Sequence, residues 1–214
     1  MECAPNQSKK KIQKGKNNLI LLALINIFGA FLMINTDKDE LLIGLISDTH
    51  VPTRSDKIPE VLLKDFIDRN VDYVFHMGDF TSIEIYEHLI KKFGKDKVFA
   101  VIGNMDAGSS ELKKILPQSL EFDLYGHKIY ITHGSGGPSM IVRRLNKNHD
   151  LSKYDIIIFG HTHHPMNQIN EKDGKLYLNP GTCTPIDGGL TVESSYGFLK
   201  ISKEKVEPEI VYLE

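Results

Sequence analysis

The chain has 214 residues, which suits one domain with enough material for a sizeable hydrophobic core. Its net charge of -2 and its ordinary composition, 41% hydrophobic and 25% charged, argue against a protein that binds nucleic acid through a broad basic surface. The two cysteines, Cys3 and Cys183, provide neither a disulfide framework nor the spacing of a zinc site.

The first 40 residues differ in composition from the remainder. Five lysines between Lys9 and Lys16 precede sixteen residues, 19–34, in which Asn26 is the only clearly polar side chain. A basic stretch followed by an apolar one is typical of a signal peptide or an N-terminal membrane anchor. Sixteen residues are few for a spanning helix, which needs about 20, and no Ala-x-Ala-like cleavage site follows.

Two interpretations of this extension stay open. Residues 19–34 associate with a membrane and anchor the protein there, or the gene start is over-extended, translation begins at Met33 and the protein is cytoplasmic. In both cases we leave residues 1–40 out of the fold prediction. Residues 41–214 are assigned to a single domain, because the first buried strand begins close to that point.

That first strand is an apolar run that begins at Ile43 and ends abruptly in Asp48-Thr49-His50. An apolar run bounded by polar residues is typical of a strand buried on both faces. In an extended chain, residues i and i+2 point to the same side. We therefore expect Asp48 and His50 to face a common point beyond the carboxyl end of the strand, where open α/β sheets bind their ligands.

The next elements alternate between helix and strand. Pro59 suits the first position of a helix that runs to about Asn70. A second helix is predicted to begin with a capping box formed by Thr81 and Glu84. Strand, helix and strand in this order imply parallel βαβ units with right-handed crossovers. Two further buried strands are predicted, at residues 73–75 and 98–102.

The pattern changes after Leu120. Apolar residues alternate on both sides of Gly126, which predicts a β-hairpin. A short helix is predicted at 138–145, another fully apolar strand at 155–159, and antiparallel strands at 175–178, 196–201 and 210–213. We therefore predict an α/β fold in which two facing sheets are covered by helices on the outside.

Polar side chains of the types that bind metal ions follow five of these predicted strands. Taken singly, each has an ordinary structural explanation, because Asp-x-His and Gly-Asn are common in turns and a histidine can simply end a hairpin. Five such turns at five buried strand ends favour a binding site. The set comprises two carboxylates, one amide and four imidazoles: Asp48, His50, Asp79, Asn104, His133, His161 and His163.

Such a set can hold two divalent metal ions if one carboxylate bridges them. A pair of ions about 3.5–4 Å apart is the usual device for activating water against a phosphorus centre. Because the set is rich in imidazole, it suits Mn, Fe, Ni or Zn better than Mg or Ca, which prefer oxygen ligands alone.

With these residues the chain resembles the calcineurin-like metallophosphoesterases, above all their small single-domain bacterial and archaeal phosphodiesterases. The resemblance extends from about Leu42 to the end and implies a four-layer sandwich of two mixed β-sheets flanked by helices. It also implies that Asp48, His50 and His163 hold the first ion, that Asn104, His133 and His161 hold the second, and that Asp79 bridges them. The motifs that carry it are Asp48-Thr49-His50, Gly78-Asp79, Gly103-Asn104, His133-Gly134, Gly160-His161-Thr162-His163 and Asn179-Pro180-Gly181-Thr182.

The implied activity is hydrolysis of a small phosphodiester by water that two divalent ions activate, with Mn2+ favoured over Ni2+, Fe2+ or Zn2+. Asp79 and Asn104 are the expected catalytic residues, and Asn104 and Arg54 are expected to bind the phosphate. An ordinary solvated loop arginine is an equal alternative for Arg54. Many larger members carry a histidine in the place of Met105 that protonates the leaving alcohol, so we expect aryl diesters to be the better substrates here.

Two alternatives stay open at this point. The same site suits a phosphomonoesterase or nucleotidase, because substrate specificity depends on the pocket walls. A non-catalytic protein-binding scaffold is the second alternative, since a retromer subunit of eukaryotes has this fold. The expected partner is a small phosphoester, no nucleic-acid surface is evident, and a homo-oligomer remains open.

Overall fold

The computed structural model describes residues 34, 36–184 and 193–213. The predicted membrane segment, 19–34, lies outside these residues apart from Ile34, which is buried in the core. Across the described ranges, no helix combines the length and apolar character that crossing a bilayer requires.

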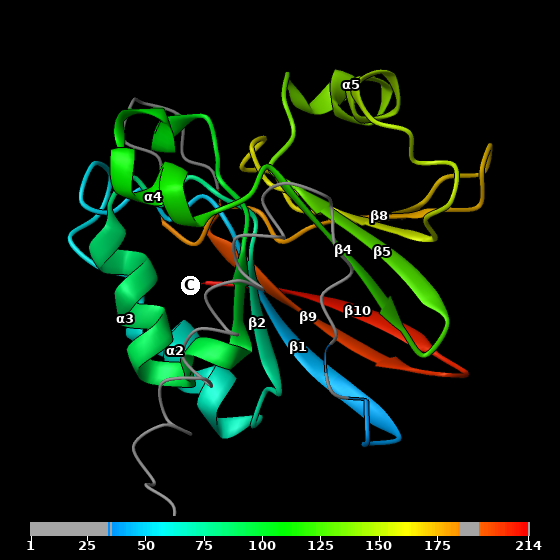
Figure 1. The fold of residues 1–214 in the computed structure, drawn as a ribbon, viewed down its shortest axis with the longest axis horizontal. Helices are drawn as coiled ribbons and strands as arrows, with labels where there is room; N and C mark the ends of the chain where they lie inside the picture. The colour runs from blue at the N-terminus through cyan, green and yellow to red at the C-terminus, as the bar shows by residue number, and fades with distance from the viewer. Residues whose placement is uncertain (1–33, 35, 185–192, 214) are drawn as a thin grey trace, which may run out of the picture.

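Two five-stranded sheets face each other in the described part of the chain (Figure 1). Sheet A has the order β10-β9-β1-β2-β3, and sheet B has the order β4-β5-β6-β8-β7. Both are mixed, because β1, β2 and β3 are parallel, as are β5, β6 and β8, while β9, β4 and β7 run antiparallel to these neighbours. The strands of sheet A are β1 Glu40–Ile46, β2 Tyr73–His76, β3 Val98–Ala100, β9 Ser195–Ser202 and β10 Val206–Tyr212. Those of sheet B are β4 Ser119–Leu124, β5 His127–Thr132, β6 Ile156–Ile158, β7 Met166–Ile169 and β8 Leu176–Asn179.

Helices cover the outer faces of the sheets and complete four layers. Two helices, α2 (Glu60–Asp68) and α3 (Ile83–Phe93), pack on sheet A, and α5 (Ile141–Asn148) packs on sheet B. The four-layer sandwich of two mixed sheets is therefore confirmed. The shorter helices are α4 (Ser110–Ile115), η1 (Lys95–Lys97), η2 (Met105–Gly108) and η3 (Pro138–Met140).

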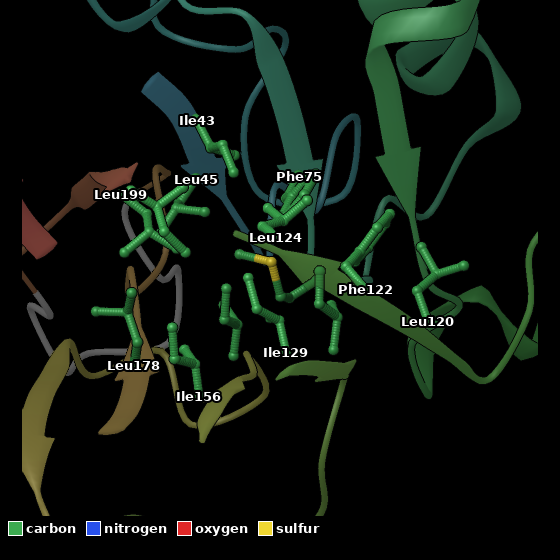
Figure 2. Close-up of a cluster of buried hydrophobic side chains, with 14 of the residues drawn as sticks. Ile43, Leu45, Phe75, Leu120, Phe122, Leu124, Ile129, Ile156, Leu178 and Leu199 are labelled. Carbon is green, nitrogen blue, oxygen red and sulfur yellow. The ribbon is translucent and has the colours of Figure 1, made fainter. Parts of the chain in front are cut away.

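The central core lies between the two sheets (Figure 2). Ile43 and Leu45 of β1 are fully buried there, and Phe75 of β2 stacks on Phe122 of β4 with 4.9 Å between ring centroids. Each large apolar side chain buried in this way contributes about 1.5–3 kcal/mol to stability. The core fixes one sheet against the other, and this brings the loops at their strand ends together.

A second core between sheet A and its helices explains the glycine inside β1. Phe66 of α2 packs edge-on against Tyr196 and Phe198 of β9. A Cβ atom on Gly44 would approach the Phe66 ring to 2.7 Å. Gly44 therefore allows α2 to lie close to the sheet, where any larger residue would push it away.

Two sequence predictions about local structure are wrong. The capping box does not form, because α3 begins after Ser82 without a side-chain cap. The hydroxyl of Thr81 instead donates to the carbonyl of Val51 at 2.8 Å. The later strands are not all antiparallel, because β8 pairs in parallel with β6 and antiparallel only with β7. β7 itself was not predicted, since it is a mostly exposed edge strand without a clear apolar pattern.

Candidate metal centre

All seven predicted ligands lie at one edge of the sandwich, where strands of both sheets end. Sheet A contributes the residues that follow β1, β2 and β3, and sheet B contributes those that follow β5 and β6. The site therefore depends on the packing of the two sheets. Asp48, His50, Asp79 and Asn104 come from sheet A, and His133, His161 and His163 come from sheet B.

Successive left-handed turns, rather than extended backbone, aim these side chains at the site. β1 ends at Ile46 and β6 ends at Ile158, so the two pairs spaced at i and i+2 lie beyond the strands. The expectation that strand alternation aligns Asp48 with His50 is therefore wrong. A positive φ in a residue other than glycine costs on the order of 1–3 kcal/mol, so neighbouring contacts must hold it. The residues concerned are Asp48 (φ 52°), His50 (46°), Asp79 (60°), His161 (68°) and His163 (59°).

Three of the predicted ligands, Asp48, His50 and His163, form the enclosed group. Asp48 and His50 are fully buried, and His163 exposes only 15% of its side chain. Nε2 of His163 lies 3.3 Å from Oδ1 of Asp48 and 3.1 Å from Nε2 of His50. One ligand atom from each of these residues and from Asp79 lies within 4.8 Å of all the others. The structure thus brings together the set expected for the first ion.

The open group consists of Asn104, His133 and His161. Oδ1 of Asn104 lies 3.0 Å from Nε2 of His133 and 2.8 Å from Nδ1 of His161. The two imidazole nitrogens are 3.3 Å apart. Only His133 is buried, while His161 is half-buried and Asn104 is exposed. These are the residues expected around the second ion, at the solvent side of the site.

Asp79 lies between the two groups. Its Oδ2 is 3.7 Å from Nε2 of His50 and 3.3 Å from Nε2 of His133. Its Oδ1 accepts the backbone N–H of Met105 at 2.7 Å. One carboxylate oxygen is therefore held by the backbone, and the other faces both groups, as a bridging ligand would.

Asp106 fixes the loop that carries Asp79. Its buried carboxylate accepts the backbone N–H groups of Asp79, Thr81 and Gly103 at 3.0, 2.8 and 2.8 Å. Three donors on one carboxylate tie the end of β2 to the turn that presents Asn104. Asp106 therefore has a structural role in holding these two loops together.

Hydrogen bonds between the sheets hold Asp48. Its Oδ2 accepts the backbone N–H of His161 at 3.0 Å and the hydroxyl of Ser47 at 2.5 Å. Gly160 leaves room for this contact, because a Cβ there would fall onto the Ser47 hydroxyl. The hydroxyl of Thr182 donates to the Asp48 carbonyl at 2.7 Å. Sequence analysis assigned no role to Ser47 or Thr182, although Thr182 lies in the Asn179-Pro180-Gly181-Thr182 motif.

The charges of the site differ between residues of the same type. Although burial favours its neutral form, the hydrogen bond to His163 and the charge of His133 lower the pKa of Asp48 to about 2. Burial lowers the pKa of His50 to about 4, so its imidazole is neutral at pH 7. Burial acts against the charge of His133 too, but the hydrogen bond to Asp79 and the charge of Asp48 raise its pKa to about 9. A cation at the open group must therefore displace a proton from His133.

The enclosed group fits a divalent cation. His50 and His163 direct their Nε2 atoms at each other, and two nitrogen lone pairs can face one another in this way only with a proton or a cation between them. Over the described ranges, Nδ1 of His50 is the one buried side-chain polar atom without a hydrogen-bond partner. The polar contacts of this ring are therefore made through Nε2, toward the carboxylates. A carboxylate and imidazole set suits Mn, Fe, Ni or Zn.

The open group is less ready for a cation. Nε2 of His161 accepts the backbone N–H of Gly136 at 2.9 Å. In the neutral imidazole the proton is then on Nδ1, the nitrogen that faces Asn104. Ligation through Nδ1 requires loss of that proton. Each group thus has a suitable donor set, and the enclosed group has its ligand atoms buried and directed at one point.

Two further residues border the ligands. Arg54 is half-buried, and one of its terminal guanidinium nitrogens lies 3.2 Å from Nδ1 of His163. The structure thus places Arg54 beside the enclosed group. Met105 follows Asn104 directly and is 49% exposed, so its thioether side chain lies on the solvent side of the open group.

Comparisons with known sequences and structures agree with a metal site of this kind. The family model described as the calcineurin-like phosphoesterase superfamily domain matches residues 41–204. A probable metallophosphoesterase of Methanothermobacter thermautotrophicus is 34% identical over 171 residues, which cover 80% of this chain and 92% of that protein. A phosphodiesterase of Methanocaldococcus jannaschii is 31% identical, covering 76% of this chain and 95% of that protein. Among solved structures, Vps29 of Entamoeba histolytica complexed with Zn2+ aligns with a TM-score of 0.63 at 25% identity, covering 80% of this chain and 99% of that one.

Proposed function

The chain belongs to the calcineurin-like phosphoesterase superfamily, and from this premise we propose that it is a metal-dependent phosphodiesterase. The family indicates a phosphoric ester hydrolase. The preference for a diester is supported by the related phosphodiesterase of Methanocaldococcus jannaschii. The proposed ligands are the enclosed and open groups joined by Asp79.

Two divalent ions, when bound, supply a water of lowered pKa and withdraw charge from the phosphoryl oxygens. Mn2+ is the proposed ion, with Ni2+, Fe2+ and Zn2+ as alternatives, because the donor set mixes imidazole with carboxylate and amide oxygens. Asp79 keeps its Oδ2 free for bridging because the backbone of Met105 holds its Oδ1.

The remaining groups bind and orient the phosphoryl group. Asn104 is exposed and directs its Oδ1 at His133 and His161, which leaves its amide hydrogens free to donate to a phosphoryl oxygen. Arg54 approaches from the enclosed group, and its guanidinium matches the geometry of a phosphate. Met105 has no proton to donate, so a leaving group that departs as a stable phenolate is favoured.

The observation that carries this proposal is the position of Asp79 Oδ2, within 3.7 Å of His50 and 3.3 Å of His133. Asp79→Ala removes the one carboxylate shared by both groups. We expect it to lower Mn2+-supported hydrolysis of bis(p-nitrophenyl) phosphate at least 100-fold and to reduce the metal content measured by elemental analysis. Asp96→Ala, at an exposed acid of η1, is the matched control. Equal activity and metal content in the Asp79→Ala and wild-type proteins would remove the proposal.

A protein-binding scaffold is the alternative that the Vps29 structure favours. The two functions differ in what they require of the open group. A scaffold that turns over no phosphoester tolerates Asn104→Ala without loss of its function, whereas the phosphodiesterase does not. Turnover of diesters, monoesters and cyclic nucleotides, each with Mn2+ and Ni2+, separates the scaffold from the enzyme and a diesterase from a monoesterase or nucleotidase.

A further inference from the structure

A hollow of about 460 Å³ lies beside the open group. Asn104 and His133 form part of its wall, together with Lys113 of α4, Gln118 just before β4 and Asn148 at the end of α5. Its volume falls in the lower part of the range for small-molecule sites. Gly103 and Gly134, which flank Asn104 and His133 in their motifs, also line the hollow, but the wall residues from α4 and α5 lie outside the motifs that identify the metal centre.

The hollow lies where one of the two ester substituents of a bound phosphodiester, here called an arm, would project. Asn104 is the proposed phosphoryl ligand, and it lines the hollow with its neighbour Gly103. A phosphoryl group held at Asn104 therefore has one ester oxygen close to the opening. The arm on that oxygen enters the hollow or projects into solvent, so the walls of the hollow decide which arms are favoured.

The walls combine the apolar side chains of Ile102 and Ala107 with polar groups that can bind a small ligand. Nδ2 of Asn148 lies 3.5 Å from the hydroxyl of Ser135, and Nδ1 of His149 is held by the Tyr130 hydroxyl at 2.9 Å. Within the described ranges, no Phe, Tyr or Trp lines the hollow. Proteins that hold nucleobases without base-edge contacts rely on such aromatic rings for stacking. A polar arm without a base fits these walls better.

Lys113 gives the hollow its charge. It is the one lysine or arginine in the lining, and it makes no ion pair within the parts of the chain that the structure describes. Its neighbour on α4, Lys114, is also exposed but does not line the hollow. An ammonium group without a protein carboxylate beside it favours an anion in the space that it faces.

We propose that this hollow selects phosphoesters whose second arm carries an anionic group, a carboxylate or a further phosphate, and that Lys113 determines this specificity. The inference rests on the proposed function for the anchoring of the phosphoryl group at Asn104. Lys113 would act on the distal anion and leave the reacting phosphorus to the metal centre. Its effect is then confined to ligands that carry that anion.

Direct binding tests the inference without turnover. Methylphosphonate and 3-phosphonopropionate share the phosphonate anchor, and only the second carries a distal carboxylate. We expect isothermal titration calorimetry with the Mn2+-loaded full chain to show roughly three- to tenfold tighter binding of 3-phosphonopropionate. Lys113→Gln should abolish that advantage, Lys113→Arg should keep most of it, and Lys114→Gln, the matched control, should leave it unchanged.

Two results would overturn the inference while sparing the proposed function. Equal affinity of the two phosphonates in the wild-type protein, with aryl diester hydrolysis intact, would show that the hollow does not recognise the anion. Equal weakening of both phosphonates in Lys113→Gln would show that Lys113 binds the anchor itself. If the wild-type protein neither binds methylphosphonate nor hydrolyses the aryl diester, the proposed function fails and the inference fails with it.

Discussion

The enclosed and open groups use the same kinds of ligand but differ in how the fold holds them. In the enclosed group, Asp48 is buried and hydrogen-bonded across the two sheets, and His50 is neutral with its Nε2 facing the carboxylates. In the open group, Asn104 is exposed, His133 tends to hold a proton, and Nδ1 of His161 carries its hydrogen toward Asn104. The protein therefore holds one half of the centre in buried, fixed positions and leaves the other half open to solvent.

This difference has a chemical consequence. A rigid, dehydrated donor set binds its ion tightly and exchanges it slowly, because the fold already holds the ligand side chains in position. An exposed set beside a 460 Å³ hollow leaves space for a phosphoryl group. We infer that the enclosed group retains its ion between turnovers and that substrate enters at the open group.

The largest expected effect comes from the enclosed group. Asp48→Asn keeps the size of the side chain and an oxygen for the His161 N–H, but it removes the charge. We expect affinity for the tightly held ion to fall about 100-fold or more, since changes even to residues behind the ligands cost 10- to 100-fold. Elemental analysis after dialysis measures the loss, and circular dichroism checks that the fold is kept. A variant that retained both ions would contradict the division into groups.

The second prediction concerns the packing behind the enclosed group. His76 is buried, stacks on Phe80 and contacts the hydroxyl of Thr49, and burial lowers its pKa to about 3. The unfolded chain, with a histidine pKa near 6.5, binds this proton first as the pH falls, so stability decreases between about pH 6.5 and pH 3. From pH 7 to pH 5 this histidine alone should lower the free energy of unfolding by about 2 kcal/mol.

His76→Asn isolates this contribution, since its side-chain oxygen can still accept the N–H of Gly78. Urea unfolding of the chelator-treated protein at both pH values measures the change. We expect the pH-dependent loss to be about 2 kcal/mol smaller in the variant than in the wild-type protein. An identical loss in both proteins would show that His76 does not carry the acid sensitivity.

The smallest effect is expected at the open group. Asn104→Ala removes one exposed ligand, so the second equivalent of Mn2+ should bind about tenfold more weakly while the first is unaffected. Electron paramagnetic resonance provides the measurement, because two neighbouring Mn2+ ions give a spin-coupled signal that a single ion does not. Equal weakening of both equivalents would mean that the two groups are not independent.

The residues that meet at the candidate site were predictable from the sequence, but the contacts that hold them in place were not. Asp48 and His161 were recognisable because each polar residue ends a buried apolar run, a pattern that local sequence records. The left-handed turns were missed because these residues are not glycine. The hydrogen bonds at these turns come from the adjacent Ser47 and, through tertiary contacts, from Asp106 and Thr182. The wall residue Lys113 was missed for a similar reason, since it reaches the site only through the packing of α4.

The order of strands in sheet A has a consequence for how the protein is made. β1 lies between β2 and β9, and all of sheet B is encoded between β3 and β9. The ribosome therefore completes sheet B while one edge of β1 still has no partner. At about 5–20 residues per second, β9 follows the end of β1 by roughly 8–30 s. During that interval β1 presents an apolar strand edge, the kind of surface that molecular chaperones cover and that pairs wrongly when they do not.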